Sequence, residues 1–471
     1  MLRKALLVLS GNAAASLLLL ARNLIIARMI PVEDYGVAAT FAVAMAVIEM
    51  ASAFGLQQQI VQSKEGDNPH FQAVLQGFQL LRGVIGGLVL FLISGPMARF
   101  LGIPEVIWAY QVLAIVPVLN ALVHFDIHRM NRRMRYGPMI LTGVLPALAS
   151  LALVWPLAQW LGDWRVTLWT ILVQAMLRTV TSHLVAERHW RVAFDRDIMV
   201  SSLRFGWPLL LNTLMMFLVF QGDKLIVGRL IGMEALAIFA MGMTLSLTPT
   251  LVMAKSAQNL FLPRLSQLQA EAGTPPFQAL AHATLQAAIL NGAIVILAIN
   301  LAGVWLVTAL FNGKYDALLP LLTAFGLLNG LRVFKAGPAV IGMACGHTAN
   351  AMLANLPRVA VLPLAWMLID GGGTLAELLW LGIGAELAGF GLSVLLVVRR
   401  PGLALRPLLG TALALAAFGL ANSGLPMLPD VITGWHIGLV QIFSFVLLLA
   451  SMRTLWHVFL RYSPPAGPPP L

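Results

Sequence analysis

Fourteen apolar segments of about bilayer length dominate this sequence, and they limit its fold more than any other feature. A membrane-spanning helix needs about 20 mostly apolar residues. The segments lie near 5–29, 36–57, 77–100, 105–125, 137–161, 166–187, 206–229, 234–254, 279–302, 316–339, 351–369, 375–398, 406–422 and 435–456. They predict an all-α polytopic membrane protein with about 14 transmembrane helices.

The composition agrees with this prediction. Of the 471 residues, 59% are hydrophobic and only 10% are charged, whereas a soluble domain carries about 25% charged residues. A chain this apolar must expose its surface to lipid, which excludes a soluble globular protein. The first apolar run is too long for a signal peptide and is interpreted as an uncleaved helix. The single cysteine, Cys345, permits no intrachain disulfide, and the residues predict no metal site and no cofactor.

Arginine and lysine residues are distributed unevenly between the connections. With the N-terminus placed in the cytoplasm, and with residues at span ends counted on the adjoining side, 18 of the 30 lie on the cytoplasmic side, 5 lie outside and 7 lie deeper within the spans. The basic connections include 128–137, 187–197 and 399–406. Cytoplasmic loops of membrane proteins collect such charges. The net charge of +11 is therefore explained without nucleic acid, and both termini are predicted to be cytoplasmic.

A short motif occurs twice, about 200 residues apart. The sequence NLIIARMI begins at Asn23 and KLIVGRLI begins at Lys224, and their alignment places Arg28 opposite Arg229. The copies fall in the first and seventh predicted spans, so both point the same way through the membrane. This arrangement predicts two parallel six-helix halves, as in transporters whose halves rock about a site between them.

The repeat also predicts how the chain is divided. We expect an N-terminal six-helix lobe at 1–200 and a C-terminal six-helix lobe at 201–400, facing a central cavity. Two additional transmembrane helices occupy 401–462, and a Pro-rich tail occupies 463–471. The segment 259–273 is either an amphipathic segment along the cytoplasmic interface or an ordinary connector.

The segment 21–62 resembles the opening of bacterial polysaccharide flippases, the Wzx-type branch of the MATE-like MOP superfamily. The family's "aRxLgpedyG" text corresponds to residues 27–36, and its "a.lGl...lv" text corresponds to residues 53–61. Residues 205–232 and 261–267 are similar to the family's seventh helix and to its connection between helices eight and nine. One departure is Met29-Ile30, where the family has Leu-Gly. In helix count and order the resemblance covers essentially the whole chain.

The resemblance implies a flippase that moves undecaprenyl-diphosphate-linked oligosaccharide from the cytoplasmic to the periplasmic leaflet for polysaccharide biosynthesis. It implies transport by alternating access in the cell inner membrane, with no covalent chemistry and therefore no enzyme activity. The implied partners are the lipid-linked glycan, through its diphosphate headgroup, and membrane lipids. Other polysaccharide assembly proteins are further candidate partners, and nucleic acid is not one.

Seven basic residues fall within the predicted spans. Burying one at mid-bilayer costs at least ~2.5–3.5 kcal/mol, so they are expected to face an aqueous or protein interior. Such cations would bind a diphosphate. An arginine guanidinium can donate two parallel hydrogen bonds to phosphate oxygens, and a lysine ammonium attracts them as a point charge. The predicted substrate contacts are Arg22, Arg82, Lys224, Arg332, Lys335 and Arg358. The seventh basic residue, Arg178, lies near the cytoplasmic end of its span, so its side chain can extend to the membrane surface. For each of the other six, the alternative to substrate contact is that the side chain extends to the membrane surface or pairs with an acid.

Acidic residues near the spans are fewer, and two are candidates for coupling transport to H⁺ or Na⁺. These are Glu49 in the second span and Asp223 in the seventh. A buried carboxylate has a raised pKa unless a cation lies beside it, and either state suits ion coupling. For Asp223 the alternative is a counter-ion of a nearby base. The other acidic residues in or near the predicted spans are Asp126, Glu377 and Glu386.

Two other function classes remain open at this point. A cation-coupled small-molecule or drug exporter of the same superfamily is disfavoured, because basic residues outnumber acidic ones within the spans. A membrane glycan-processing enzyme is disfavoured because no long outside loop and no paired Asp motif occur in the sequence. The absence of a Walker motif indicates that ATP is not the direct energy source.

Overall fold

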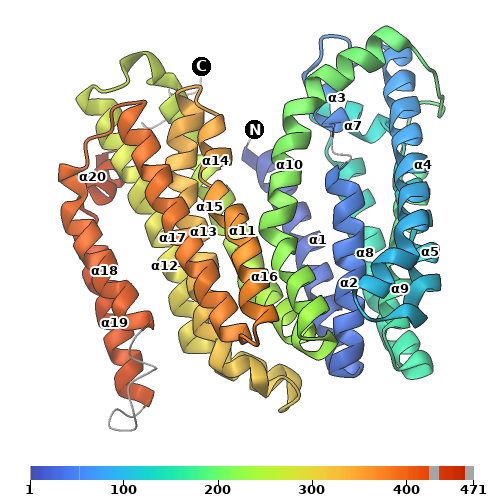
Figure 1. Cartoon of the computed structure of the whole chain (residues 1–471). Helices are drawn as coiled ribbons and strands as arrows, with labels where there is room; N and C mark the ends of the chain where they lie inside the picture. Colours follow the sequence, from blue (N-terminus) through green and yellow to red (C-terminus); the bar gives the residue numbers. More distant parts are fainter. Residues whose placement is uncertain (1, 52–53, 424–433, 462–471) are drawn as a thin grey trace. The chain divides into compact units, whose positions relative to one another are not determined.

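A computed structural model describes residues 2–51, 54–423 and 434–461, and every regular element in these ranges is a helix (Figure 1). The all-α fold class is therefore confirmed. In the described ranges, eight helical segments are long and apolar enough to cross a membrane. The total of about 14 transmembrane helices remains a prediction, and the Pro-rich tail at 463–471 lies outside the described residues.

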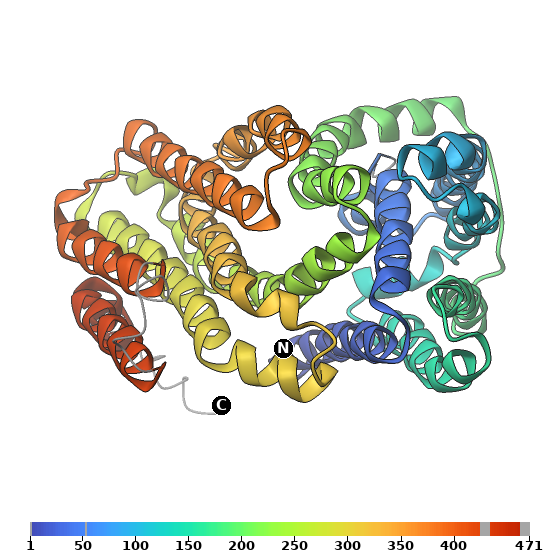
Figure 2. The same cartoon turned by 60° about the horizontal axis from the view of Figure 1, so that its bottom comes forward.

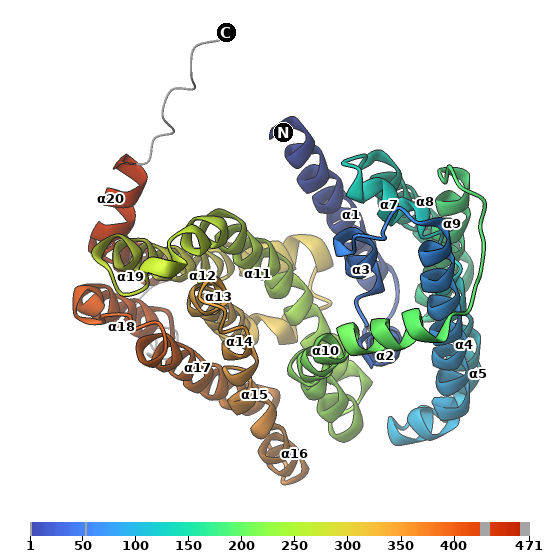
Figure 3. The ribbon, with the colours of Figure 1, turned by 90° about the horizontal axis from the view of Figure 1, so that it is seen from above.

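The chain divides into two compact units, residues 1–240 and 241–471. The helices of the first unit are α1 (Leu2–Met29), α2 (Val32–Ala51), α3 (Leu56–Gln62), α4 (Pro69–Phe100), η1 (Pro104–Val106), α5 (Ile107–Leu113), α6 (Ile115–Ala121), α7 (Asp126–Arg132), α8 (Gly137–Leu161), α9 (Arg165–Leu184) and α10 (Arg196–Leu230). The short helices α3 and α7 lie side by side at one end of this unit, near the start of α4 (Figures 1 and 3). The boundaries predicted from the repeat, at 200 and 400, remain predictions.

Helix α11 (Met233–Gln267) begins in the first unit and continues into the second. The other helices of the second unit are η2 (Gln269–Glu271), α12 (Pro275–Phe311), η3 (Asp316–Leu321), α13 (Leu322–Ala344), α14 (Ala349–Leu353), α15 (Leu356–Ala360), α16 (Leu362–Asp370), α17 (Leu375–Arg399), η4 (Arg406–Leu408), α18 (Leu409–Ser423), α19 (Gly434–Ser451) and α20 (Arg453–Arg461). Helices α18 and α19 pack together beside α12 (Figure 2).

Large apolar side chains cover much of the outer surface of the helices. Trp160 of α8 is 80% exposed, and Leu413 of α18 is 74% exposed. In α4, α8 and α12 only 28% of the most apolar 18-residue window is buried. Such surfaces are stable only against lipid, because water would leave the apolar side chains solvated. The chain is therefore a multi-pass membrane protein.

Both copies of the repeated motif end one helix and begin the next. Arg28 and Arg229 lie in the last turns of α1 and α10, where a cation complements the helix dipole. Glu33 and Glu234 lie in the first turns of α2 and α11, where an acid does the same. The repeat in the sequence thus encodes the same helix–turn–helix twice.

The helices that follow the two copies, α2 and α11, approach each other closely inside the first unit. A Cβ added at Gly36, in the first turns of α2, would come within 1.8 Å of the carbonyl oxygen of Met233, the first residue of α11. Only glycine permits so close a backbone approach. The glycine that closes the family-like text at 27–36 therefore has a packing role.

Several helices are longer than the apolar segments that predicted them. Helix α4 begins at Pro69 and α10 at Arg196, eight to ten residues before the predicted spans. Helix α11 continues to Gln267, so most of the segment 259–273 prolongs this helix. The cause is that polar residues carry these helices beyond the lipid, where apolar composition no longer marks them.

Candidate functional site

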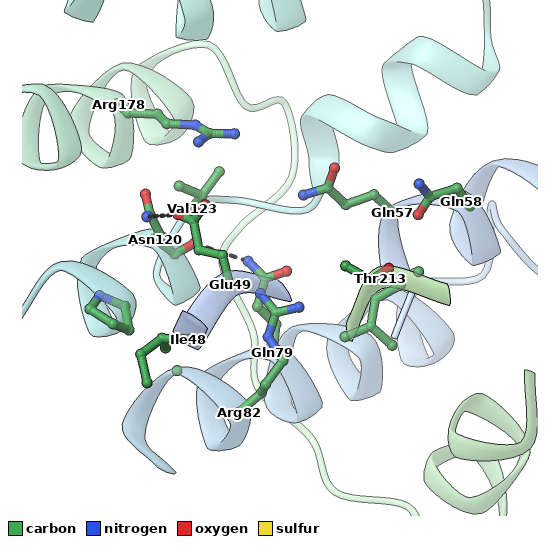
Figure 4. A pocket seen from close by; sticks show the side chains of 14 residues that line it. Ile48, Glu49, Gln57, Gln58, Gln79, Arg82, Asn120, Val123, Arg178 and Thr213 are labelled. Carbon is green, nitrogen blue, oxygen red and sulfur yellow. Dashed lines mark hydrogen bonds between the residues drawn. The ribbon is translucent and has the colours of Figure 1, made fainter. Parts of the chain in front are cut away.

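The first unit contains a polar cavity of about 370 Å³ between α2, α3, α4, α6, α9 and α10 (Figure 4). Its charged lining residues are Glu49, Arg82 and Arg178. Neutral polar side chains complete the lining, namely Gln57, Gln58, Gln79, Asn120 and Thr213. A cavity lined in this way is a site for a polar or ionic ligand inside an otherwise apolar bundle.

Glu49 lies at the centre of this cavity. Asn120 donates a hydrogen bond from Nδ2 to Oε1 of Glu49 over 3.2 Å. Arg82 extends into the cavity from α4 and Arg178 from α9, and both lie within electrostatic range of the Glu49 carboxylate (Figure 4). Two cations around one carboxylate leave the site with a net positive charge.

A second cavity, of about 260 Å³, adjoins the same residues. Glu49, Asn120 and Arg178 line both cavities, and Gln174 of α9 lines only the second. These three side chains therefore form a wall shared by two polar spaces. A proton or small cation passing between the spaces would meet the carboxylate of Glu49.

Arg22 lies beside the second cavity and is held by neutral oxygen atoms. Its Nη1 donates to Oε1 of Gln174 over 2.5 Å, and its Nε and Nη2 donate to Oδ1 of Asn23 over 3.4 Å. Arg22 is 8% exposed. Within the described ranges, no carboxylate forms an ion pair with this guanidinium. Its positive charge is thus oriented by amide groups without being neutralised.

The other two charges predicted in the first unit lie on α10. Asp223 is buried and its neighbour Lys224 is partly buried, near the C-terminal end of this helix. Neither residue lines the cavity around Glu49. The structure therefore brings Arg82 and Glu49 together and leaves Asp223 and Lys224 apart from them.

In the second unit, three predicted cations surround one carboxylate. Arg332 Nε lies 2.8 Å from Oε1 of Glu386, and Lys335 Nζ lies 2.5 Å from Oε2. Arg358 Nε lies 3.8 Å from Oε1. The side chains of the four residues are at most 10% exposed, and Glu386 is fully buried. This cluster, called the Glu386 cluster below, carries three positive charges and one negative charge.

Neutral amides hold the Glu386 cluster at its edges. Arg332 donates from Nη1 to Oδ1 of Asn329 over 3.1 Å, and Lys335 donates from Nζ to Oδ1 of Asn355 over 2.7 Å. These bonds give Arg332 and Lys335 one further acceptor each beside Glu386, and hydrogen bonds of this kind lower the cost of burying a charge.

Two glycines of α17 lie against the cations of the cluster, and at one of them, Gly389, the backbone of a neighbouring segment comes too close for a side chain. Gly382 and Gly389 lie one turn before and one turn after Glu386, on the same helical face. A Cβ at Gly382 would lie 3.6 Å from Arg358, and one at Gly389 would lie 3.5 Å from Lys335 and 2.5 Å from the backbone of Ala354. Gly389 therefore lets α17 approach Ala354 closely, three residues from Glu386.

Reasoning from the sequence selected the cations of the cluster but not its acid. Arg332 and Lys335 stand three apart on α13, which placed them on one face. In the sequence, Glu386 is one of several acids near the spans, and the position of Arg178 predicts a side chain that snorkels. In the described part of the chain, no three His, Cys, Asp or Glu side chains gather as a metal site requires. The chemistry available at both sites is ionic and hydrogen-bonding.

Comparison with known proteins relates the chain to polysaccharide biosynthesis. A family model described as "Polysaccharide biosynthesis protein" matches residues 25–318. The amylovoran biosynthesis protein AmsL of Erwinia amylovora is 25% identical over 328 residues, which cover 67% of this chain and 81% of the relative. The succinoglycan biosynthesis transport protein ExoT of Rhizobium meliloti (strain 1021) is 21% identical over 245 residues, which cover 52% of this chain and 49% of ExoT.

Solved structures share the fold. The lipid II flippase MurJ in an inward closed conformation matches with a TM-score of 0.70 at 13% identity, covering 97% of this chain and all of that chain. An inward-facing multidrug resistance MATE transporter of the MOP superfamily matches with a TM-score of 0.67 at 16% identity, covering 81% of this chain and 92% of that chain. At these identities the likeness is one of fold alone, and the fold is that of the MATE and MurJ transporters.

Proposed function

Because this chain belongs to the polysaccharide biosynthesis protein family, we propose that it is a flippase for undecaprenyl-diphosphate-linked oligosaccharide. The family match over residues 25–318 carries the proposal. It is supported by the fold shared with the lipid II flippase MurJ over nearly the whole chain, and by the two relatives named for exopolysaccharide synthesis and transport. Transport would proceed by alternating access, without covalent chemistry.

The cations within the spans suit a substrate with a diphosphate headgroup. Arg82 reaches solvent in the Glu49 cavity, and Arg22 carries a charge that only amides hold. In the Glu386 cluster, three cations lie around the carboxylate of Glu386, and a cationic cluster of this kind suits an anionic headgroup. We propose that Arg22, Arg82, Lys224, Arg332, Lys335 and Arg358 contact the headgroup during the cycle.

The proposed function is tested directly by reconstitution. The purified chain in liposomes should transfer a fluorescent undecaprenyl-diphosphate-linked oligosaccharide between leaflets, measured by quenching from the outside. The structural likeness to a multidrug MATE transporter makes drug export the second candidate. Efflux of a cationic dye without glycan transfer would replace the flippase with a drug exporter.

We propose that Glu49 is the coupling carboxylate, because it lies in the wall shared by two polar cavities. Glu49→Gln keeps an oxygen for Asn120 and removes the charge. A charge-assisted hydrogen bond contributes about 1.5–3 kcal/mol, so transport should fall roughly tenfold or more. Stimulation by an imposed pH gradient should disappear, as measured in proteoliposomes.

The control for this substitution is Glu65→Gln, an exposed acid in the connection before α4. It should leave both the rate and the gradient response unchanged. Full gradient stimulation in Glu49→Gln would remove this residue from coupling and leave Asp223 of α10 as the remaining candidate.

The proposed location is the cell inner membrane, with both termini in the cytoplasm. Reporter fusions after Arg135 and after Arg400 should give cytoplasmic signals, and a fusion near Gly372 should give a periplasmic signal. The reason is that Arg and Lys concentrate in the connections predicted to be cytoplasmic. A periplasmic signal after Arg135 would overturn this orientation.

The partners proposed are the lipid-linked glycan, membrane lipids and other polysaccharide assembly proteins.

A further inference from the structure

A third cavity of the first unit, of about 310 Å³, is lined by other residues than the two cavities around Glu49. It is formed by the start of α4, the connection between α6 and α7, and the connection after α9. These segments belong to the end of the unit that carries α3 and α7, which is the predicted cytoplasmic end (Figure 1). Its lining residues are Pro69, Gln72, Ala73, Gln76, His124, Glu187, Arg188, His189 and Arg191.

The position of Arg188 in this cavity is fixed by neutral acceptors. Its Nη1 donates to Oε1 of Gln72 over 2.9 Å, and its Nη2 donates to the carbonyl oxygen of Asp67 over 2.9 Å. Arg191 is exposed at the rim. The carboxylate of Glu187, the acid of the lining, is already bound by Arg129 and Arg135. The cavity therefore offers two guanidinium groups and an acid that other cations neutralise.

Asp126 anchors the connection that carries these arginines. It accepts hydrogen bonds from the backbone N–H groups of Glu187 over 2.9 Å and Arg188 over 3.2 Å, and from Nε of Arg129 over 2.5 Å. Burial alone would raise the pKa of Asp126, but these hydrogen bonds hold its pKa below the ordinary value. The connection is thus built rigidly on an ionised carboxylate.

His124 supplies an N–H that makes no well-aligned hydrogen bond to a described residue, although the backbone carbonyl of Arg188 lies beside the ring. Its Nδ1 accepts a hydrogen bond from the N–H of Asp126 over 3.1 Å, so the neutral ring must carry its proton on Nε2. Within the described residues, Nε2 has no hydrogen-bond partner, although His124 is only 2% exposed. Buried polar groups are almost always satisfied, so an unsatisfied one in the wall of a cavity indicates a missing water or ligand.

The start of α4 adds to the positive potential of the cavity. Asn68 caps this helix, and Pro69, its first residue, lines the cavity together with Gln72 and Ala73. The N-terminus of a long helix carries a partial positive charge and attracts anions. Arginine forks bind phosphate oxygens in particular.

We infer that this cavity binds a phosphate group, held by Arg188, Arg191 and the Nε2–H of His124. The phosphate belongs either to an anionic lipid headgroup of the adjoining leaflet or to a soluble molecule. The inference does not rest on the proposed transport, because the site is separate from the Glu49 cavity and binding is measured without flipping.

The test is calorimetric titration of the purified full-length chain in neutral detergent. The ligands are inorganic phosphate, short-chain phosphatidylglycerol and short-chain phosphatidylcholine. Saturable binding of phosphate alone assigns the site to a soluble phosphate; tighter binding of phosphatidylglycerol assigns it to the leaflet. Binding of neither, or binding of phosphatidylcholine as tightly as phosphatidylglycerol, overturns the inference.

Two variants and a matched control locate the binding. Arg191→Gln removes a rim cation and should weaken binding roughly tenfold. His124→Asn keeps an acceptor for the N–H of Asp126 but lacks the donor at Nε2, and should also weaken binding. Arg196→Gln removes an exposed cation at the start of α10 that does not line the cavity, and should leave binding unchanged. Equal losses in Arg191→Gln and Arg196→Gln would reveal diffuse charge attraction and contradict the site.

Discussion

Glu386→Gln should destabilise the protein by about 3–5 kcal/mol, because it removes the charge of a carboxylate that pairs with three buried cations. Arg332, Lys335 and Arg358, whose side chains are at most 10% exposed, would then repel one another with little screening by water. The expected result is a lower unfolding midpoint of the purified protein and a lower level in the membrane. Thermal unfolding followed by tryptophan fluorescence, together with immunoblots, measures both.

Removing one cation of the cluster should cost less than removing its acid. Lys335→Met keeps the apolar stem of the side chain, and Glu386 retains Arg332 at 2.8 Å. The double variant Lys335→Met/Glu386→Gln should be more stable than the sum of the two single losses predicts, because one repelling charge has gone. The control is Glu271→Gln, an exposed acid of η2 in the same unit. A Glu386→Gln protein as stable as this control would show that the cluster is solvated.

The ion pairs also change what is expected of alanine variants. A cation that faces only substrate can be removed at little structural cost, whereas one that pairs with a buried acid cannot. Loss of export in Arg332→Ala or Lys335→Ala therefore needs a matched protein level before it is assigned to substrate binding.

The parts of the fold that lipid dictates could be predicted from the sequence. The segment predicted at 137–161 forms α8, Gly137–Leu161, because Gly162 adopts a left-handed conformation and ends the helix. Backbone groups in lipid must be bonded within the helix, so apolar runs and helices coincide there. The same reasoning fails for α10, whose first ten residues are polar enough to leave the membrane.

The partners of the charges could be predicted only in part. The spacing of Arg332 and Lys335 placed them on one face of α13, but Glu386 lies more than 50 residues away, on α17. No local pattern pairs residues across that distance; packing of α13 against α17 does. Arg178 shows the same limit. Its position along α9 predicts a side chain that extends to the membrane surface, whereas in the structure the side chain lines a cavity formed with neighbouring helices.

The charge of Arg22, rather than its shape, should decide transport. In the structure its guanidinium is held by the amide oxygens of Gln174 and Asn23, so its charge remains for a phosphate. Arg22→Lys should keep partial transport, because the point charge survives although the bidentate fork is lost. Arg22→Gln should reduce transport roughly tenfold or more, the loss expected for a charge-assisted contact. Surface glycan is measured at equal expression in a strain that lacks its own flippase.

A substitution at Gln174 tests whether transport needs the positive charge of Arg22, without changing Arg22 itself. Gln174→Glu would place a carboxylate 2.5 Å from Nη1 and neutralise the guanidinium in place. If the free charge of Arg22 attracts the diphosphate, Gln174→Glu should lower transport as much as Arg22→Gln, while the new ion pair maintains the fold. Arg99→Gln, an exposed cation at the end of α4, is the control and should transport normally. Normal transport in both Arg22→Gln and Gln174→Glu would make Arg22 a structural residue that joins α1 to α9.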